Sequence, residues 1–487
     1  MAKNTPKDNP TKSSSPGPYK IVAATGFGVF LSALDGSIVN VSLFTMMNDL
    51  GVTLIAIQWI VVAYLIIYTS TMPLMGKFGD RFGKETIFQA GMIVFVTGSL
   101  FCALSPILEI LIISRVFQAF GAGMMTANGL ALVTYFTTNE NRGRAIGLNS
   151  VILAGALGLG PVLGGILTEF FNWPSIFLVN LPVGIVGYFV FRMIVPSTER
   201  VREVKFDTIG AALFFLFLFL VVYTVSVYEL VTGEIILVLL LASIAVLVLF
   251  IYRESNFQSP IIPTKVLKDR RISSSFFSAL LAYMAIVPIT YQLPFFLQEA
   301  LGWPPAPTGL FLVANPLIIS ISGPFAGLLS ESMKGRNQTV MGLAIVLVGL
   351  LFIGFAVPNP VLIFIGILIL GLGLSLYTVA NGNFIMTSAP REYMGVVSAL
   401  TNISRTTGFS IAIATITSIF TILLGVFQIS MSYEMAYLNS YQIATWSFSI
   451  FVIAAIVISA FRGLSPAEGG DEIICDPVIV TDCEESN

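Results

Sequence analysis

Long uninterrupted apolar segments are the feature that most restricts how this chain can fold. Stretches of about 20 apolar residues recur along it, and a helix of that length crosses the ~30 Å hydrocarbon core of a bilayer. Only 10% of the residues are charged, whereas roughly a quarter of an average soluble domain is charged. The segments do not alternate between polar and apolar residues as the strands of a membrane β-barrel do. The sequence therefore predicts an all-α polytopic membrane protein and excludes a soluble enzyme.

Fourteen membrane spans can be delimited. We expect them at residues 20–43, 54–75, 86–105, 108–135, 145–170, 174–194, 207–228, 234–252, 273–298, 308–330, 339–357, 360–386, 395–425 and 441–461. Of the 24 Lys and Arg residues, all except Arg115 and Arg405 lie in the N-terminus or in every second loop. Because cationic side chains mark the cytoplasmic side, we expect a multi-pass protein of the cytoplasmic membrane with both termini in the cytoplasm.

A short internal repeat suggests two related halves. Pro73-Leu74-Met75-Gly76 returns as Pro324-Phe325-Ala326-Gly327 about 250 residues later, which superimposes the first six spans on the last six. Two such halves around a central site are the usual plan of alternating-access transporters. We expect a disordered N-terminus (1–19), an N-terminal six-helix half (20–195), a linker (196–206), a central helix pair (207–252), a cytoplasmic loop (253–272), a C-terminal six-helix half (273–462) and an acidic cytoplasmic tail (463–487).

Three charged residues, Asp35, Arg115 and Arg405, lie inside spans, where each charge costs ~2.5–3.5 kcal/mol on insertion scales. Asp35 lies about 12 Å from the outer end of the first span and Arg115 about 10 Å from that of the fourth, so we expect them at similar depth. Burial favours a neutral carboxyl group, and an approaching cation favours the carboxylate. We predict a proton-coupling site at Asp35 and Arg115, with a static salt bridge as the alternative, and a gating or packing role for Arg405.

Several kinds of chemistry are excluded by missing residues. The chain has no histidine, and neither of its Gly-Lys pairs has the glycine that a P-loop places five positions earlier. We therefore expect no enzyme activity, no metal, no cofactor and no ATP, and nothing indicates a nucleic-acid partner. Uphill transport by such a chain has to use an ion gradient.

The loop from Gly76 to Lys84 resembles the signature between helices 2 and 3 of the major facilitator superfamily. The resemblance rests on Gly76, Asp80, Arg81 and Gly83, and it implies a conformational latch in which Asp80 faces a helix N-terminus or a cation of the other half. Anchoring of the loop by its positive charges is the alternative. Glu85 stands where a second basic residue is usual.

Two further motifs resemble the same superfamily. Arg115-Val116-Phe117-Gln118 is similar to its helix-4 motif. Gly160, Pro161, Gly164 and Gly165 resemble the helix-5 motif of its antiporters, which implies export, with a plain packing surface as the alternative. The stretches 34–41, 58–65, 173–184, 206–210, 260–263 and 402–408 are similar to its 14-span drug:proton antiporters, so that the resemblance covers about residues 25–415.

The expected substrate pocket combines amides and aromatic rings. Its candidate residues are Asn40, Gln58, Tyr64, Gln118, Tyr291, Gln292, Asn315 and Asn381, and an interhelical hydrogen bond is the alternative for each amide. The tenth span has no acidic residue, which disfavours dicationic substrates.

The sequence thus predicts a proton-coupled exporter of amphiphilic, cationic or neutral small molecules that works by alternating access. Its partners would be the substrate, protons and the lipid bilayer, and the need for accessory export proteins stays open. The alternative within transport is a dedicated exporter of one metabolite, such as a siderophore, an amino acid or a peptide. A receptor would carry an extramembrane signalling domain, and a channel would not accumulate solute uphill.

Overall fold

The structure is a computed structural model that describes residues 17–200, 207–227, 231–257, 260, 268–389 and 394–463. Nearly all of the expected N-terminus (1–19) and acidic tail (463–487), and parts of the linker (196–206) and of the loop (253–272), lie outside the described residues. All regular elements in the described part are helices, and 14 stretches are long and apolar enough to cross a membrane. The predicted fold class and number of spans are confirmed.

The described helices follow one another in chain order. They are α1 (Pro18–Leu50), α2 (Leu54–Ile57), α3 (Trp59–Phe82), α4 (Lys84–Ala103), α5 (Leu108–Phe136), α6 (Asn139–Phe171), α7 (Ser175–Leu178), α8 (Asn180–Ile194), α9 (Thr208–Ser226), α10 (Gly233–Asn256), α12 (Arg270–Met284), the π-helical turn η1 (Pro288–Gln292), α13 (Leu293–Phe295), the π-helical turn η2 (Phe296–Ala300), α14 (Pro305–Leu312), α15 (Ala314–Ser332), α16 (Gly335–Ala356), α17 (Pro360–Ser388), α18 (Met394–Gln428), α19 (Tyr433–Ser447) and α20 (Ser449–Ala460).

Two predicted span boundaries need correction. The first helix continues to Leu50 instead of ending near residue 43, because the glycine that stops it is Gly51, which has a left-handed φ of 63°. The last span begins at Tyr433 instead of residue 441. The prediction was too late because polar residues such as Glu434 and Asn439 interrupt the apolar pattern of the first two turns. At the other end, α1 begins at Pro18, so the end of the segment expected to be disordered is helical.

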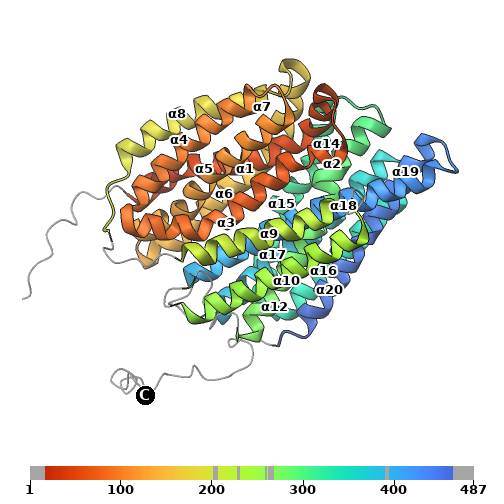
Figure 1. The fold of residues 1–487 in the computed structure, drawn as a ribbon. Coiled ribbons are helices and arrows are strands. Elements are labelled where there is room, and N and C mark those ends of the chain that lie inside the picture. The colour runs from red at the N-terminus through yellow and green to blue at the C-terminus, as the bar shows by residue number, and fades with distance from the viewer. Residues whose placement is uncertain are drawn as a thin grey trace, which may run out of the picture.

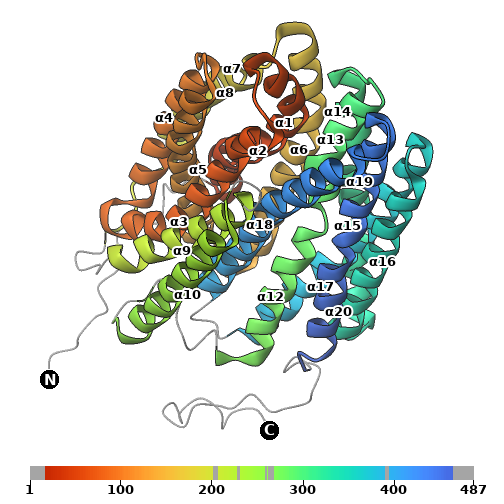
Figure 2. The same ribbon diagram turned by 45° about the vertical axis from the view of Figure 1, so that its right-hand side comes forward.

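The helices pack as two groups with a pair of helices between them (Figures 1 and 2). The first group consists of α1 to α8, the second group of α12 to α20, and the central pair of α9 and α10. Pro73 lies inside α3 and Pro324 inside α15, so the two copies of the sequence repeat occupy the second spanning helix of each group.

The central pair lies against both groups. Trp59 at the start of α3 contacts Phe219 and Tyr223 of α9, with ring centroids 6.2 Å apart in each case. Farther along α9, the Val225 carbonyl accepts a hydrogen bond of 2.8 Å from Ser418 of α18. The membrane-spanning part of α10, in contrast, is only 11% buried, so α10 presents most of its surface outward.

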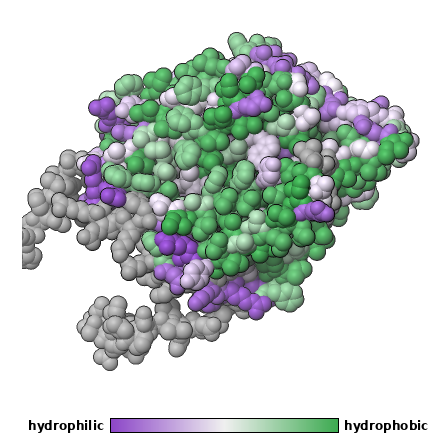
Figure 3. All heavy atoms as spheres, viewed as in Figure 1, coloured by the Kyte–Doolittle hydropathy of each residue, from purple (hydrophilic) through white to green (hydrophobic). Residues whose placement is uncertain are grey.

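The flank of the molecule is mostly hydrophobic, and hydrophilic residues gather mainly toward its two ends (Figure 3). We call the end at which α1 begins the basic end, and the opposite end the acidic end. The basic end carries Lys20, Lys77, Lys84, Arg192, Arg253, Arg270, Arg271, Lys334, Arg336 and Arg462. The acidic end carries Asp49, Glu109, Glu169, Glu234, Glu299 and Glu434.

Within the first group, α4 and α5 approach each other closely because glycines line their contact. A Cβ atom added at Gly121 would lie 2.5 Å from the backbone nitrogen of Phe95, which is too close for any side chain. Small residues have this role in membranes because helix association there depends on van der Waals packing.

We predict that Gly121→Ala destabilises the protein by about 1–3 kcal/mol, since the added methyl group overpacks the contact between α4 and α5. Thermal unfolding of the purified protein in detergent measures this effect. Gly155→Ala is the matched control, because nothing lies within 4 Å of an added Cβ there. Equal unfolding temperatures for the two variants would contradict the prediction.

Candidate functional site

A buried carboxylate lies in the middle of α1. Asp35 is fully buried and accepts hydrogen bonds from Arg115 Nη1 at 2.5 Å, Gln118 Nε2 at 2.8 Å and Asn180 Nδ2 at 3.0 Å. Arg115 and Gln118 come from α5 and Asn180 from the start of α8. One cation and two amide donors thus surround the carboxylate inside the first group, which removes the penalty of a lone charge in hydrocarbon.

The Arg115 guanidinium joins a fourth helix, α3, to this network. Its Nε donates to the Ile60 carbonyl of α3 at 3.3 Å, and its carbon lies 4.0 Å from the centroid of the Tyr64 ring. Ser99 of α4 accepts a hydrogen bond of 2.8 Å from Gln118. The ion pair therefore connects α1, α3, α4, α5 and α8.

The expected contact between Asp35 and Arg115 is present, and it agrees with the similar depth predicted for the two residues. Asp35 lies about fifteen residues from the end of α1 instead of eight, because the helix continues to Leu50. Ser99 and Asn180 were not predicted as members of the site. A single hydroxyl or amide in an apolar segment carries no pattern that would distinguish it.

The helix-5 motif lies where α6 contacts α1 on one side and the second group on the other. An added Cβ at Gly164 would lie 2.5 Å from the Ile38 carbonyl of α1, and one at Gly160 would overlap Ser37. An added Cβ at Gly165 would overlap the Pro305 carbonyl of α14, and the Pro161 carbonyl lies directly against Gly309 of α14. These small residues allow α6 to contact both neighbours.

Among the described residues, three hydrogen bonds join the two groups directly. Gln298 donates to the Val41 carbonyl at 2.9 Å, and the Ala306 nitrogen donates to Glu169 at 2.9 Å. Both lie toward the acidic end. The third, between Thr69 of α3 and Thr406 of α18 at 2.6 Å, lies near the middle of α3. The first two bonds and the glycine contacts of α6 therefore hold the two groups together at the acidic end.

The four residues expected to form the latch lie at the basic end of α3 and at the turn into α4. Gly83 has a φ of 99°, which favours glycine, and Gly76 lies inside α3 with nothing within 4 Å of an added Cβ. Asp80 is 44% exposed and pairs with Lys84 at 2.5 Å. In this conformation the Asp80 ion pair thus stays within the first group.

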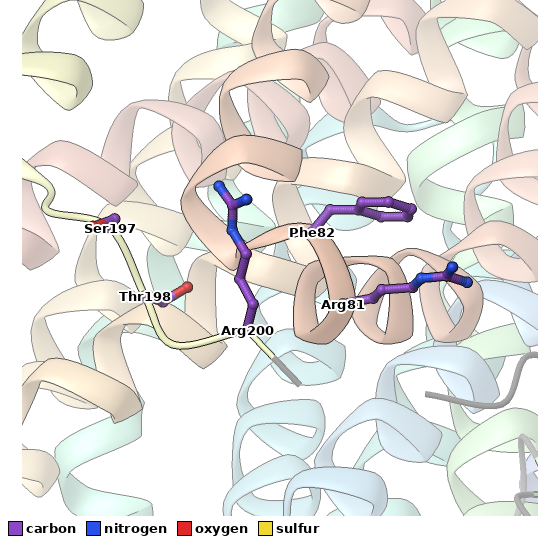
Figure 4. Close-up of a pocket in the computed structure, with 5 residues that line it drawn as sticks. All are labelled: Arg81, Phe82, Ser197, Thr198 and Arg200. Atoms are coloured by element: carbon purple, nitrogen blue, oxygen red, sulfur yellow. The ribbon is translucent and has the colours of Figure 1, made fainter. Parts of the chain in front are cut away.

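Glu85, the unusual residue beside this motif, has a structural partner. Its Oε2 accepts hydrogen bonds from the Thr198 nitrogen at 3.0 Å and from the Thr198 hydroxyl at 2.6 Å. Thr198, Ser197 and Arg200 lie on the segment that follows α8 and, with Arg81, line an open hollow of about 690 Å³ (Figure 4). Glu85 therefore holds the start of the linker against α4.

The predicted pocket residues fall into three sets. Gln118 and Tyr64 belong to the ion-pair network described above. Asn381 accepts a hydrogen bond of 2.7 Å from the buried Arg462 guanidinium and donates to the Ser275 carbonyl. The third set is buried and has no hydrogen-bond partner among the described residues: Asn40 Oδ1, Asn315 Oδ1 and both side-chain amide atoms of Gln58 and Gln292.

The unpartnered amides suit a ligand site, since a buried polar group without a hydrogen bond is costly. Tyr291 and Gln292 lie in η1, one of two π-helical turns that flank the short helix α13. Such turns occur frequently at functional sites. The sequence predicted Tyr291 and Gln292 as pocket residues, but it gave no sign of the π-helical turns.

Arg405 lies on α18, partly exposed, three residues before Gly408. An added Cβ at Gly408 would overlap the Leu280 carbonyl of α12, so α18 and α12 are in close contact here. This agrees with packing of the helix around Arg405, while the role of its charge stays a prediction.

Comparison with known proteins gives a consistent assignment. A family model described as Major Facilitator Superfamily matches residues 25–413. The riboflavin transporter RibZ of Clostridioides difficile is 30% identical, with 89% of this chain and 95% of RibZ covered. Multidrug resistance protein Stp of Mycobacterium tuberculosis is 28% identical, with 81% and 74% covered. The methylenomycin A resistance protein of Bacillus subtilis is 29% identical, with 81% and 85% covered.

Solved structures share the fold at low sequence identity. A bacterial homologue of the human lysosomal transporter Spinster, in an inward-facing and unoccupied conformation, superimposes with a TM-score of 0.67 at 15% identity. The superposition covers 92% of this chain and 98% of that chain. A mutant of the peptide transporter POT, in complex with sulfate, gives a TM-score of 0.65 at 17% identity, with 93% and 96% covered.

We predict that Arg115→Gln destabilises the protein by about 3–5 kcal/mol, because it leaves the Asp35 carboxylate buried without a cation. Adding Asp35→Asn to this variant should restore part of the loss, since the double variant leaves no unpaired charge at this site. Thermal unfolding of the single and double variants forms a double-mutant cycle. Additive losses in that cycle would show that the two charges do not interact.

We predict that Gly165→Ala opens the acidic end, because the added methyl group overlaps Pro305 of the second group. A clash of about 1–3 kcal/mol would change the ratio of closed to open molecules roughly 5- to 150-fold. Distances between spin labels at the exposed positions Phe170 and Leu310 report the opening. Gly158→Ala, where an added Cβ meets nothing within 4 Å, is the control and should leave the distances unchanged.

Proposed function

Because the chain belongs to the major facilitator superfamily of membrane transporters, we propose that it exports amphiphilic small molecules from the cell in exchange for protons. The observation that supports this most is the buried ion pair between Asp35 of α1 and Arg115 of α5. α1 also contacts the second group near the acidic end, where Val41 accepts a hydrogen bond from Gln298. Relatives named for multidrug and methylenomycin A resistance support export as the direction of transport.

We place the basic end in the cytoplasm, following the rule that cationic loops stay inside. Both termini would then be cytoplasmic. With that orientation, the contacts at the acidic end join the groups on the outer side, as an inward-facing conformation would require. The first and second groups would then be the two halves (20–195 and 273–462) that rock against each other around a central site.

A short segment of α1 connects the ion pair to the closed side. Two and three residues after Asp35, Ser37 and Ile38 contact the glycines of α6, and Val41 accepts the hydrogen bond from Gln298 of the second group. For protons to move inward, Asp35 would take up a proton from outside in the outward-facing conformation, where protonation removes its charge and weakens its bond to Arg115. It would lose that proton to the cytoplasm in the inward-facing conformation and pair with Arg115 again. The segment would shift between these two states, which couples the proton to the contacts on the outer side.

The latch loop would act at the opposite end. In this structure Asp80 pairs with Lys84 of its own group. In the outward-facing conformation, we expect Asp80 to exchange this partner for a cation or a helix N-terminus of the second group. Gly76 and Gly83, which have no side chains, would let the second group approach the loop closely, and Arg81 would add a positive charge to that contact.

We predict that Asp35→Asn still binds substrate but does not move it uphill, since an amide cannot exchange a proton. The assay uses proteoliposomes with an acidic lumen and the zwitterionic xanthene dye rhodamine B or its cationic methyl ester. Wild-type protein should accumulate dye until a protonophore is added, and the variant should not. Binding to the variant, measured by fluorescence anisotropy, should stay within about threefold of wild type, well below the tenfold that 1.4 kcal/mol would give.

Asp49→Asn is the matched control for this experiment, because Asp49 lies exposed at the acidic end of the same helix. It should transport as the wild type does. Full gradient-driven accumulation by Asp35→Asn would contradict the proposal that Asp35 couples transport to protons. Equal signals from protein-free liposomes would show that the dye crosses the lipid by itself.

A dedicated exporter of one metabolite is the second candidate, favoured by the relative named as a riboflavin transporter. The two functions predict different results when other compounds compete with the dye for transport. Structurally unrelated compounds that each reduce accumulation of the dye support a multidrug exporter, whereas inhibition by one chemical type alone supports a dedicated one.

A further inference from the structure

Arg405 carries a positive charge into the membrane-spanning part of α18, at the interface between the two groups. The neighbouring residue, Thr406, bonds to Thr69 of α3 at 2.6 Å, and Thr69 lies near the midpoint of the span Leu54–Phe82. A charge at this depth is costly unless it meets water, a counter-charge or a ligand.

The contacts of α18 fix the direction in which residue 405 points. With about 100° between successive residues, Thr406 lies about 100° to one side of Arg405 and Gly408 about 60° to the other. Thr406 contacts α3 of the first group, and Gly408 contacts Leu280 of α12 in the second group. Arg405 therefore faces the interface between α3 and α12.

The opposite side of α18 is covered by the central pair. Ser418, about 140° away from Arg405 around the helix, bonds to Val225 of α9. Arg405 thus faces away from α9 and toward the site around which the groups would rock. Its neighbours there, Tyr283 and Phe409, have ring centroids 6.0 Å apart, and all three side chains are partly exposed.

In the described part of the chain, the charge of Arg405 has no acidic partner. Among the described residues, no hydrogen bond or ion pair joins the Arg405 guanidinium to another side chain, and its electrostatic interaction is with Tyr283. Asp35 is the acidic residue nearest the middle of any span, and it already neutralises Arg115. In the spans of the second group, Glu299 and Glu434 lie at the acidic end. The interface is left with one unbalanced positive charge.

We propose that Arg405 binds an acidic group of the transported molecule, so that the substrates are amphiphiles with a carboxylate, sulfonate or phosphate group. The guanidinium offers a planar fork of donors that suits such groups. The rings of Tyr283 and Phe409 beside it would receive the apolar part of the substrate. This inference rests on the proposed function and replaces the expectation of cationic or neutral substrates drawn from the sequence.

Rhodamine B and its methyl ester provide a matched test, because they differ only at the carboxylate. Anisotropy titrations use the full-length protein in lipid nanodiscs, with empty nanodiscs as the blank and no pH gradient. Wild-type protein should bind the acid about 10- to 100-fold more tightly than the ester, as expected for a charge-assisted pair. Arg405→Gln should abolish this preference, and Arg405→Lys should retain part of it.

Arg192→Gln is the control, since it removes an exposed cation at the basic end of α8 and should leave the preference unchanged. A wild-type protein that does not distinguish the two dyes would overturn the proposal, and so would an unchanged preference in Arg405→Gln. If that variant does not fold, modification of Arg405 by phenylglyoxal in the wild type provides the second measurement. The acid should protect Arg405 at least tenfold better than the ester, and equal protection would contradict the proposal.

The binding test is independent of proton coupling. A protein that prefers the acid but shows no gradient-driven transport would retain the Arg405 site and lose the antiport proposal. A protein that accumulates the ester as readily as the acid would retain antiport and lose the Arg405 site.

Discussion

An ionised carboxylate inside a bilayer is stable only beside a cation and donors of hydrogen bonds, and Asp35 obtains both by drawing neighbouring helices together. Arg115 and Gln118 of α5 and Asn180 of α8 bond to it directly. Arg115 also bonds to α3. The helices of the first group are held around Asp35 because a buried carboxylate requires a nearby cation. Any rearrangement that separates the pair leaves two unpaired charges in hydrocarbon.

Much of the fold was predictable because apolar length and the positions of Lys and Arg are local properties of a sequence. They sufficed for fourteen spans and for the expectation that Asp35 meets Arg115. Chain segments beyond the hydrocarbon were harder. The polar residues Asn48 and Asp49 indicated a loop, although α1 continues through them until Gly51 ends it. Helical backbone outside the bilayer needs no apolar pattern, so hydropathy does not detect it.

The site was only partly predictable, since its members depend on contacts between distant helices. The helix-5 glycines were recognised, but nothing in the sequence indicated that Gly165 meets Pro305 of the second group. Asn381 was expected in the pocket, with an interhelical hydrogen bond as the alternative, and the structure shows such a bond to Arg462. The interior position of Arg405 was evident at once, whereas its orientation toward α3 became clear only from the bond between Thr406 and Thr69.

The lengths of three helices link the transporter to the lipid around it. α1 and α6 contain 33 residues each and α18 contains 35, so each is about 50 Å long, well beyond the ~30 Å of hydrocarbon. These helices accommodate the hydrophobic mismatch by tilting or by extending into water. They also contact the other group, so rocking of the groups as proposed would change their tilt and do work against the bilayer. Membrane thickness would then contribute to the energy difference between the two conformations, and acyl-chain length would regulate transport.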